Sequence, residues 1–139
     1  EIQNTKTQEY PPYSSKTVGG KSLFAYAREG KIHEIDIPTR QIKIFNLEHI
    51  HTREISQKEM LETIEAKVAH VHGDFRQQEI LESWKRSINQ EEKALMSLLR
   101  ASVSSGTYIR SLAHAMGKKF ECGAIAYSIK RTRVGPYVM

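Results

Sequence analysis

The 139-residue sequence contains a single cysteine, Cys122, which excludes an internal disulfide and suits a protein of the reducing cytosol. Its apolar residues form no run long enough to span a bilayer, and it has no signal-peptide pattern. We therefore expect a cytoplasmic protein. The phosphate-binding loop, the dinucleotide-binding glycine motif and the nucleophile elbow are also missing, so the sequence does not point to the enzyme classes that those motifs mark.

Patterns of metal ligands are weak as well. His70 and His72 are two residues apart and would not share a helical face, while His49 and His51 would share a strand face but have no third ligand. Cys122 has no cysteine partner, and we expect it to be a small buried hydrophobic side chain rather than a catalytic thiol. No metal site and no cofactor are therefore expected.

Lysine and arginine outnumber aspartate and glutamate by 21 to 16, which gives a formal net charge of +5 and a pI near 9.4. This balance favours an anionic partner such as RNA, although it would also serve solubility alone. The basic residues cluster at Lys130-Arg131-Thr132-Arg133. In a strand, Lys130 and Thr132 would share one face and Arg131 and Arg133 the other, so only one pair would meet RNA directly.

Apolar periodicity and turn residues predict helices and strands that interleave without a strict βαβ rhythm. Ser22, Ser56 and Asp74 are candidate helix N-caps, and Ile80 and Phe120 are among the residues expected to face the core. In chain order we expect a looped segment over 1–21, a helix over 22–30, two strands within 32–47 separated by Pro38, helices over 56–71 and 74–88, a strand over 95–103, a helix over 107–120 and a strand over 124–134. This order is typical of an α+β fold with a mixed or antiparallel sheet flanked by helices.

The most informative run extends from Ser104 to Ala113, where a turn of small and hydroxyl residues leads into an apolar helical pattern. Backbone N–H groups at a helix start favour negative charge, and the planar guanidinium of Arg110 matches a carboxylate or a phosphate. If the helix begins after Arg110, Tyr108 and Arg110 would point the same way from an extended segment and line one pocket. A surface arginine beside a packing tyrosine is an equal alternative.

This run and the segments that follow it resemble the closing part of the catalytic domain of the TruB family, the synthases that isomerise a uridine in the T-loop of tRNA to pseudouridine. The matching residues are Gly106-Thr107-Tyr108-Ile109-Arg110-Ser111-Leu112-Ala113, Gly117, Cys122-Gly123-Ala124 and Lys130-Arg131-Thr132-Arg133-Val134-Gly135-Pro136-Tyr137. An earlier segment is also similar to the family, at Gln8, Pro11, Tyr13-Ser14-Ser15, Val18, Gly20-Lys21, Ala27-Arg28 and Gly30. Thr17 and Phe24 depart from the family, which usually has lysine and tyrosine there.

The resemblance implies roles for individual residues. Arg110 would pair with the catalytic aspartate and hold it ionised and oriented, and Tyr108 would contact the flipped uracil. Ile129, where the family usually has leucine, would pack against the base. Further contacts with RNA are expected from Thr107, Lys16, Lys21, Lys130, Arg131 and Arg133.

The family's nucleophilic aspartate lies in a Gly-x-Leu-Asp-type motif that is absent from this sequence. Asp36 and Asp74 are the aspartates present, and neither has that context. The chain begins with Glu1, and the resemblance covers residues 8–48 and 95–137. We therefore expect residues 1–139 to be the C-terminal part of a TruB-like catalytic domain, with a helical insertion at about 50–93.

The expected partners are the T-loop of tRNA, or a similar RNA, and the missing N-terminal half of the catalytic domain. As part of a complete enzyme, the chain would supply RNA-binding and aspartate-orienting residues without the aspartate itself. Two alternatives remain open at this point: a non-catalytic RNA-binding or accessory module, and a small domain that holds an acidic protein through its basic surface.

Overall fold

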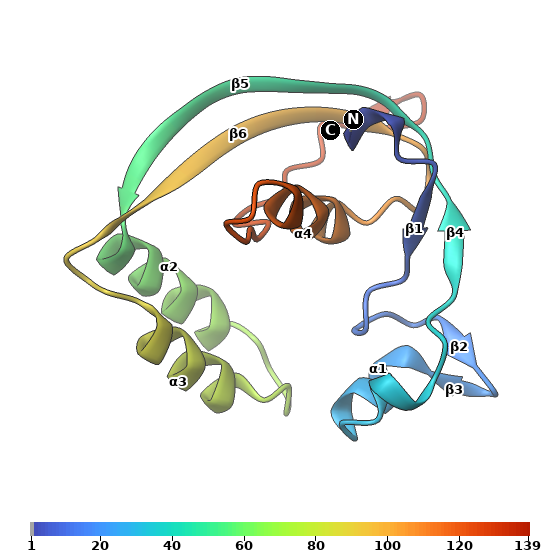
Figure 1. Cartoon of the computed structure of the whole chain (residues 1–139), viewed down its shortest axis with the longest axis horizontal. Coiled ribbons are helices and arrows are strands. Elements are labelled where there is room, and N and C mark those ends of the chain that lie inside the picture. Colours follow the sequence, from blue (N-terminus) through green and yellow to red (C-terminus); the bar gives the residue numbers. More distant parts are fainter. Residues whose placement is uncertain (1) are drawn as a thin grey trace. The chain divides into compact units, whose positions relative to one another are not determined.

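The computed structural model describes residues 2–139 (Figure 1). They fall into two compact units, which we call unit 1 (residues up to Leu47 together with Ala101–Met139) and unit 2 (Glu48–Arg100). Helices and short antiparallel strand pairs alternate along the chain, which confirms the predicted α+β class. No helix among residues 2–139 has the length and apolar character that crossing a bilayer requires.

Unit 1 begins with two strand pairs and a short helix. Strands β1 (Thr7–Glu9) and β4 (Thr39–Gln41) pair antiparallel, with Gln8 opposite Arg40. Strands β2 (Thr17–Val18) and β3 (Lys21–Ser22) form a hairpin that leads into α1 (Leu23–Arg28). The Ser22 hydroxyl accepts a hydrogen bond from the Ala25 backbone N–H at 3.2 Å, which confirms the predicted cap.

The apolar core of unit 1 joins the start of β5 (Ile44–Ser56) to helix α4 (Ile109–Lys119). Ile42, Ile44 and Leu112 are buried together, and Ile2, Leu47 and Val103 pack against them. The core therefore fixes α4 against the chain that precedes and starts β5.

Unit 2 contains a helical hairpin of α2 (Gln57–Ala69) and α3 (Gln77–Ser87), and α2 and α3 lie side by side (Figure 1). The Ser56 hydroxyl caps α2 by accepting from the Glu59 N–H at 3.0 Å, as predicted. Asp74 does not cap α3, because Arg76 takes that position in a left-handed conformation (φ +62°). Ile80 is 42% exposed, so its predicted inward position is wrong.

Strand β6 (Lys93–Val103) pairs with β5 in a long two-stranded ladder. The Thr52 and Ser97 hydroxyls lie 2.7 Å apart, and Lys93 Nζ contacts Glu54 Oε2 at 2.6 Å. Because residues later in β5 contact residues earlier in β6, the two strands run antiparallel. All four strand pairs are therefore two-stranded and antiparallel rather than parts of one mixed sheet.

Two predicted strands are wrong. Ile32–Glu34 is a 3-10 helix, η2, and not a strand. A second 3-10 helix, η1, spans Ile2–Asn4. Residues 123–132 adopt no helix or strand, and the chain ends in a hairpin of β7 (Arg133–Val134) and β8 (Tyr137–Val138). A strand requires a neighbouring backbone to pair with, and no segment among residues 2–139 forms a strand ladder with 123–132.

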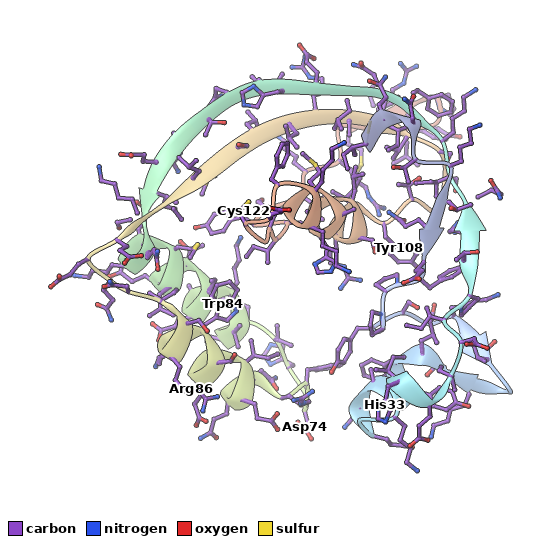
Figure 2. All side chains as sticks on the ribbon, in the orientation of Figure 1. His33, Asp74, Trp84, Arg86, Tyr108 and Cys122 are labelled. Atoms are coloured by element: carbon purple, nitrogen blue, oxygen red, sulfur yellow. The ribbon has the colours of Figure 1, made fainter. Side chains whose placement is uncertain are left out.

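The side chains around this irregular segment are more exposed than predicted. Phe120 is 67% exposed, and Ile125 is 53% exposed. Cys122, expected to be buried, is exposed just after α4 (Figure 2). All three side chains lie at the end of α4 or in the segment where the predicted strand is missing.

Candidate functional site

The turn before α4 is closed by its own hydroxyl groups. The Ser104 N–H donates to the Lys43 carbonyl at 2.8 Å, and the Lys43 N–H returns a hydrogen bond to the Ser104 hydroxyl at 2.8 Å. The Thr107 hydroxyl donates to the Ser104 carbonyl at 2.9 Å. Gly106 has a φ of +78°, a conformation that favours glycine. The hydroxyl groups of Ser104 and Thr107 therefore stabilise the turn that precedes α4, as side chains next to a helix N-terminus often do.

Gln8 binds the backbone of Tyr108 with both ends of its side-chain amide. Its Nε2 donates to the Tyr108 carbonyl at 3.1 Å, and its Oε1 accepts from the Tyr108 N–H at 2.8 Å. Gln8 is only 9% exposed. The Tyr108 N–H is thus not available to an external anion, and Tyr108 lies where the chain turns into α4 (Figure 2).

Arg40 lies against the same turn from the neighbouring strand. Its Nη2 donates to the Ser105 carbonyl at 3.3 Å, and a methyl group at Gly106 would stand 2.0 Å from Arg40 Nη1. The guanidinium carbon is 5.7 Å from the centroid of the Tyr10 ring. The Tyr10 ring meets the Tyr108 ring edge-on at 5.8 Å. Arg40 and Tyr10 thus pack around the turn.

Arg110 lies in the first turn of α4, because the helix begins at Ile109. The helix expected over 107–120 is thus present, and the alternative in which Tyr108 and Arg110 both lie in an extended segment does not apply: Tyr108 is the N-cap residue and Arg110 is helical. The Arg110 side chain is exposed, and its Nη2 lies 3.5 Å from the Tyr13 carbonyl. Within residues 2–139 it forms no ion pair with a carboxylate.

The basic stretch at the end of the chain is exposed. Lys130 and Arg131 lie in the irregular segment, so the alternation of faces predicted for a strand does not apply to them. Arg133 lies in β7, and its Nε donates to the Gly135 carbonyl at 3.0 Å. Ile129, next to this stretch, is 48% exposed. All four candidate side chains are thus accessible to a ligand.

The two N-terminal lysine candidates differ. Lys21 Nζ contacts Glu29 Oε2 at 2.5 Å and lies 4.8 Å from the Tyr26 ring centroid. The hydrogen bond from Lys21 holds the pKa of the Glu29 carboxyl below its usual value. Lys16 Nζ instead lies 5.5 Å from the Tyr10 ring centroid. Lys16 therefore keeps more of its positive charge available to an anion than Lys21 does.

The structure brings Thr107 and Tyr108 together with three residues that the sequence did not mark as site residues. Gln8 appeared only as part of a family-like segment, and Tyr10 and Arg40 carried no signal. A glutamine between Thr7 and Glu9 gives no indication of burial. In the described part of the chain, no three His, Cys, Asp or Glu side chains lie so that they could hold a metal ion together.

Comparison with known proteins confirms the resemblance. No family model matches the chain. The chain is 29% identical to tRNA pseudouridine synthase B of Heliobacterium mobile over 137 residues, covering 99% of this chain and 32% of that protein. It is 30% and 32% identical to the proteins of the same name from Thermotoga maritima and Thermotoga petrophila, over 93% of this chain and 28% of each relative. The chain thus spans less than a third of the length of these relatives.

Proposed function

We propose that this chain is part of a tRNA pseudouridine synthase that isomerises a T-loop uridine, and that it supplies RNA-binding and aspartate-orienting residues. The main support for the proposal is the position of Arg110 and the lack of a carboxylate partner for its side chain in the described part of the chain. Arg110 projects from the first turn of α4, directly after a turn fixed by Gln8 and Arg40, and it has no carboxylate partner among residues 2–139. The similarity to proteins named tRNA pseudouridine synthase B extends over nearly the whole chain.

In this proposal the guanidinium of Arg110 pairs with an aspartate carboxylate from outside the chain. The positive charge stabilises the ionised carboxylate and lowers its pKa, and the planar donor group sets its orientation. The uridine is extruded from the T-loop, its glycosidic bond is cleaved with the help of that aspartate, and the base is rotated and rejoined through carbon. Tyr108 and Ile129 contact the extruded base.

Contacts with RNA phosphates are proposed for exposed cations of unit 1. Lys130, Arg131 and Arg133 extend from the C-terminal segment, and Lys16 lies beside Tyr10. Lys21 is a weaker candidate because its ammonium group already pairs with Glu29. Thr107 contributes mainly by shaping the turn. Phosphate contacts of this kind position the RNA and make its affinity depend on salt.

The rest of the catalytic domain is proposed to cover the irregular segment 123–132. This segment is rich in strand-forming residues and has no strand partner among residues 2–139. Ile125 and Ile129 remain exposed there. A strand from the N-terminal half would satisfy this backbone and bury both side chains. The helical hairpin of unit 2 would then be an insertion in a cytoplasmic enzyme.

The test uses the full-length protein that contains this chain, with a T-loop hairpin RNA as substrate. Arg110→Ala should abolish pseudouridine formation while the Kd for RNA changes by no more than about threefold, because the arginine acts on a carboxylate rather than on phosphate. Arg53→Ala, which removes an exposed arginine of unit 2, is the matched control and should leave turnover unchanged. Normal turnover by Arg110→Ala would refute the assigned role.

A non-catalytic RNA-binding module is the second candidate. The exposed cations Lys130, Arg131 and Arg133 favour it, because RNA binding alone requires no carboxylate partner for Arg110. Salt-dependent binding of the hairpin by the full-length protein without pseudouridine formation would decide for this alternative.

A further inference from the structure

We propose that Gln8 and Arg40 act together as positioning residues that fix the turn Ser104–Tyr108 in front of α4. The proposal rests on the proposed function, because it assigns their purpose to the reaction in which Tyr108 and Arg110 take part. Neither residue needs to touch the substrate.

The register of the strands brings the two side chains together. Gln8 and Arg40 are directly opposite each other in the antiparallel pair of β1 and β4. Opposed residues in such a pair point to the same face. Gln8 is the buried residue of β1, while Thr7 and Glu9 on either side are exposed. This small sheet therefore presents one glutamine and one arginine toward the turn.

Gln8 holds the C-terminal end of the turn. Its amide donates to the Tyr108 carbonyl at 3.1 Å and accepts from the Tyr108 N–H at 2.8 Å. A pair of hydrogen bonds of this kind reproduces the pattern of a strand partner and fixes both the position and the orientation of the Tyr108 peptide groups. Tyr108 is the N-cap residue of α4, so its backbone sets where the helix begins.

Arg40 holds the middle of the turn. Its guanidinium donates to the Ser105 carbonyl at 3.3 Å and lies so close to Gly106 that a methyl group there would stand 2.0 Å from Nη1. The Tyr10 ring, 5.7 Å from the guanidinium carbon, packs against the same group. Two adjacent residues of the strand pair thus contact the turn at two successive points.

The consequence for the reaction follows from geometry. Arg110 comes two residues after Tyr108, and its side chain extends from the first helical turn. A displacement of about 1 Å in a catalytic group can lower a rate by about 100-fold. A turn fixed at two points would hold Tyr108 and Arg110 in place before RNA binds.

The experiment uses the full-length protein and compares Gln8→Leu, Arg40→Lys and Gln41→Leu. Gln8→Leu removes both hydrogen bonds at similar volume, and Arg40→Lys keeps the charge but loses the planar donor group. Gln41→Leu changes an exposed glutamine next to Arg40 and serves as the control. The measurements are kcat at saturating T-loop hairpin, the Kd for that RNA, the thermal midpoint, and the exchange rate of the Tyr108 amide proton.

We expect Gln8→Leu to lower kcat by about 10- to 100-fold with the Kd within about threefold, and to speed exchange of the Tyr108 amide about tenfold or more. Arg40→Lys should lower kcat less, and Gln41→Leu should change neither quantity. If Gln8→Leu does not fold, Arg40→Lys carries the test. Unchanged kcat in both variants of an active enzyme would overturn the positioning role and leave the proposed function standing. A wild-type protein that binds the hairpin but forms no pseudouridine would overturn the proposed function, and the positioning role with it.

Discussion

The two units of this chain differ in the sign of their charge. By sequence, unit 1 contains 13 lysines and arginines against 6 aspartates and glutamates, a formal balance of +7, whereas unit 2 contains 8 against 10, a balance of −2. The excess positive charge of the chain therefore belongs entirely to the unit that carries the turn, α4 and the basic C-terminal segment. If the chain binds RNA as proposed, this charge favours unit 1 as the part that faces the RNA.

The units also differ in how their cations are used. The ion pairs of unit 2 include Arg76 with Glu79, Lys85 with Glu65, Lys93 with Glu54 and Arg100 with Glu48. In unit 1, Lys130 and Arg131 are exposed, and neither forms an ion pair with a carboxylate of the described residues. Cations that already pair with carboxylates contribute little to phosphate binding, because the neighbouring negative charge opposes the phosphate. This difference supports the proposal that unit 2 is a structural insertion rather than an RNA-binding surface.

The sharpest difference in stability should appear between core leucines and exposed ones. Leu112 is 4% exposed in the core of unit 1. The substitution Leu112→Ala should lower the free energy of unfolding by about 2–5 kcal/mol. Leu95→Ala in unit 2 removes a side chain that is 75% exposed, and should cost less than about 0.5 kcal/mol. Urea denaturation of the full-length protein measures both. Equal costs would show that α4 does not rest on this core.

A smaller effect is expected from glycines in similar conformations. Gly106→Ala and Gly20→Ala both place a side chain at positive φ (+78° and +81°), which costs about 1–2 kcal/mol. Only Gly106→Ala also displaces the Arg40 guanidinium, which should add about 1 kcal/mol, since nothing lies within 4 Å of a methyl group at Gly20. With Arg40→Ala already present, the two substitutions should cost the same in denaturation experiments. A difference that persists would contradict the contact.

The charge comparison itself predicts a change in salt dependence. Lys130→Ala in unit 1 should weaken RNA binding and reduce the slope of log K against log salt by about one, because one phosphate contact is lost. Lys85→Ala in unit 2 removes a lysine that pairs with Glu65 at 2.9 Å, and should leave the slope unchanged. Filter binding of a T-loop hairpin across a salt series measures both. If both substitutions reduced the slope equally, unit 1 and unit 2 would not differ in their contact with RNA phosphates.

The smallest expected effect concerns acid stability of α1. The pKa of Glu29 is lowered by its hydrogen bond from Lys21, so the pair stabilises the folded state above the usual carboxyl pKa and loses that contribution as pH falls through the lowered value. Glu29 is exposed, so solvent screens the interaction strongly. Glu29→Gln should slightly flatten the stability profile below about pH 4.5, as thermal melts at several pH values would show. An identical profile would mean that the pair contributes nothing.

Local signals predicted much of the fold. The sequence predicted the helix caps at Ser22 and Ser56 and the helix that contains Leu112, because these features depend on residues close in sequence. The pairing of Gln8 with Tyr108 joins residues 100 positions apart, and no local pattern indicates it. The segment 124–134 has the composition of a strand, but a strand also requires a partner, and composition cannot supply one.

The candidate site shows the same division. Its motif was found from the sequence because a glycine turn, Tyr108 and Arg110 precede an apolar helical pattern and resemble a motif of the TruB family. The helix was expected to start at Thr107, but α4 starts at Ile109. Gln8 hydrogen-bonds the Tyr108 backbone just before that start, and no local pattern indicates this contact. Arg40 was not predicted, because it contacts the Ser105 carbonyl and Gly106, which are distant from it in the sequence.

The most direct test of the central claim is the release of tritium from position 5 of uracil in a T-loop hairpin RNA, measured with the full-length protein at saturating RNA. Rejoining the base through carbon displaces that hydrogen, so an active synthase should release one tritium for each uridine converted. We expect release by the wild-type protein and by Arg53→Ala, and none by Arg110→Ala. Tight binding of the hairpin by the wild-type protein without any release would contradict the central claim.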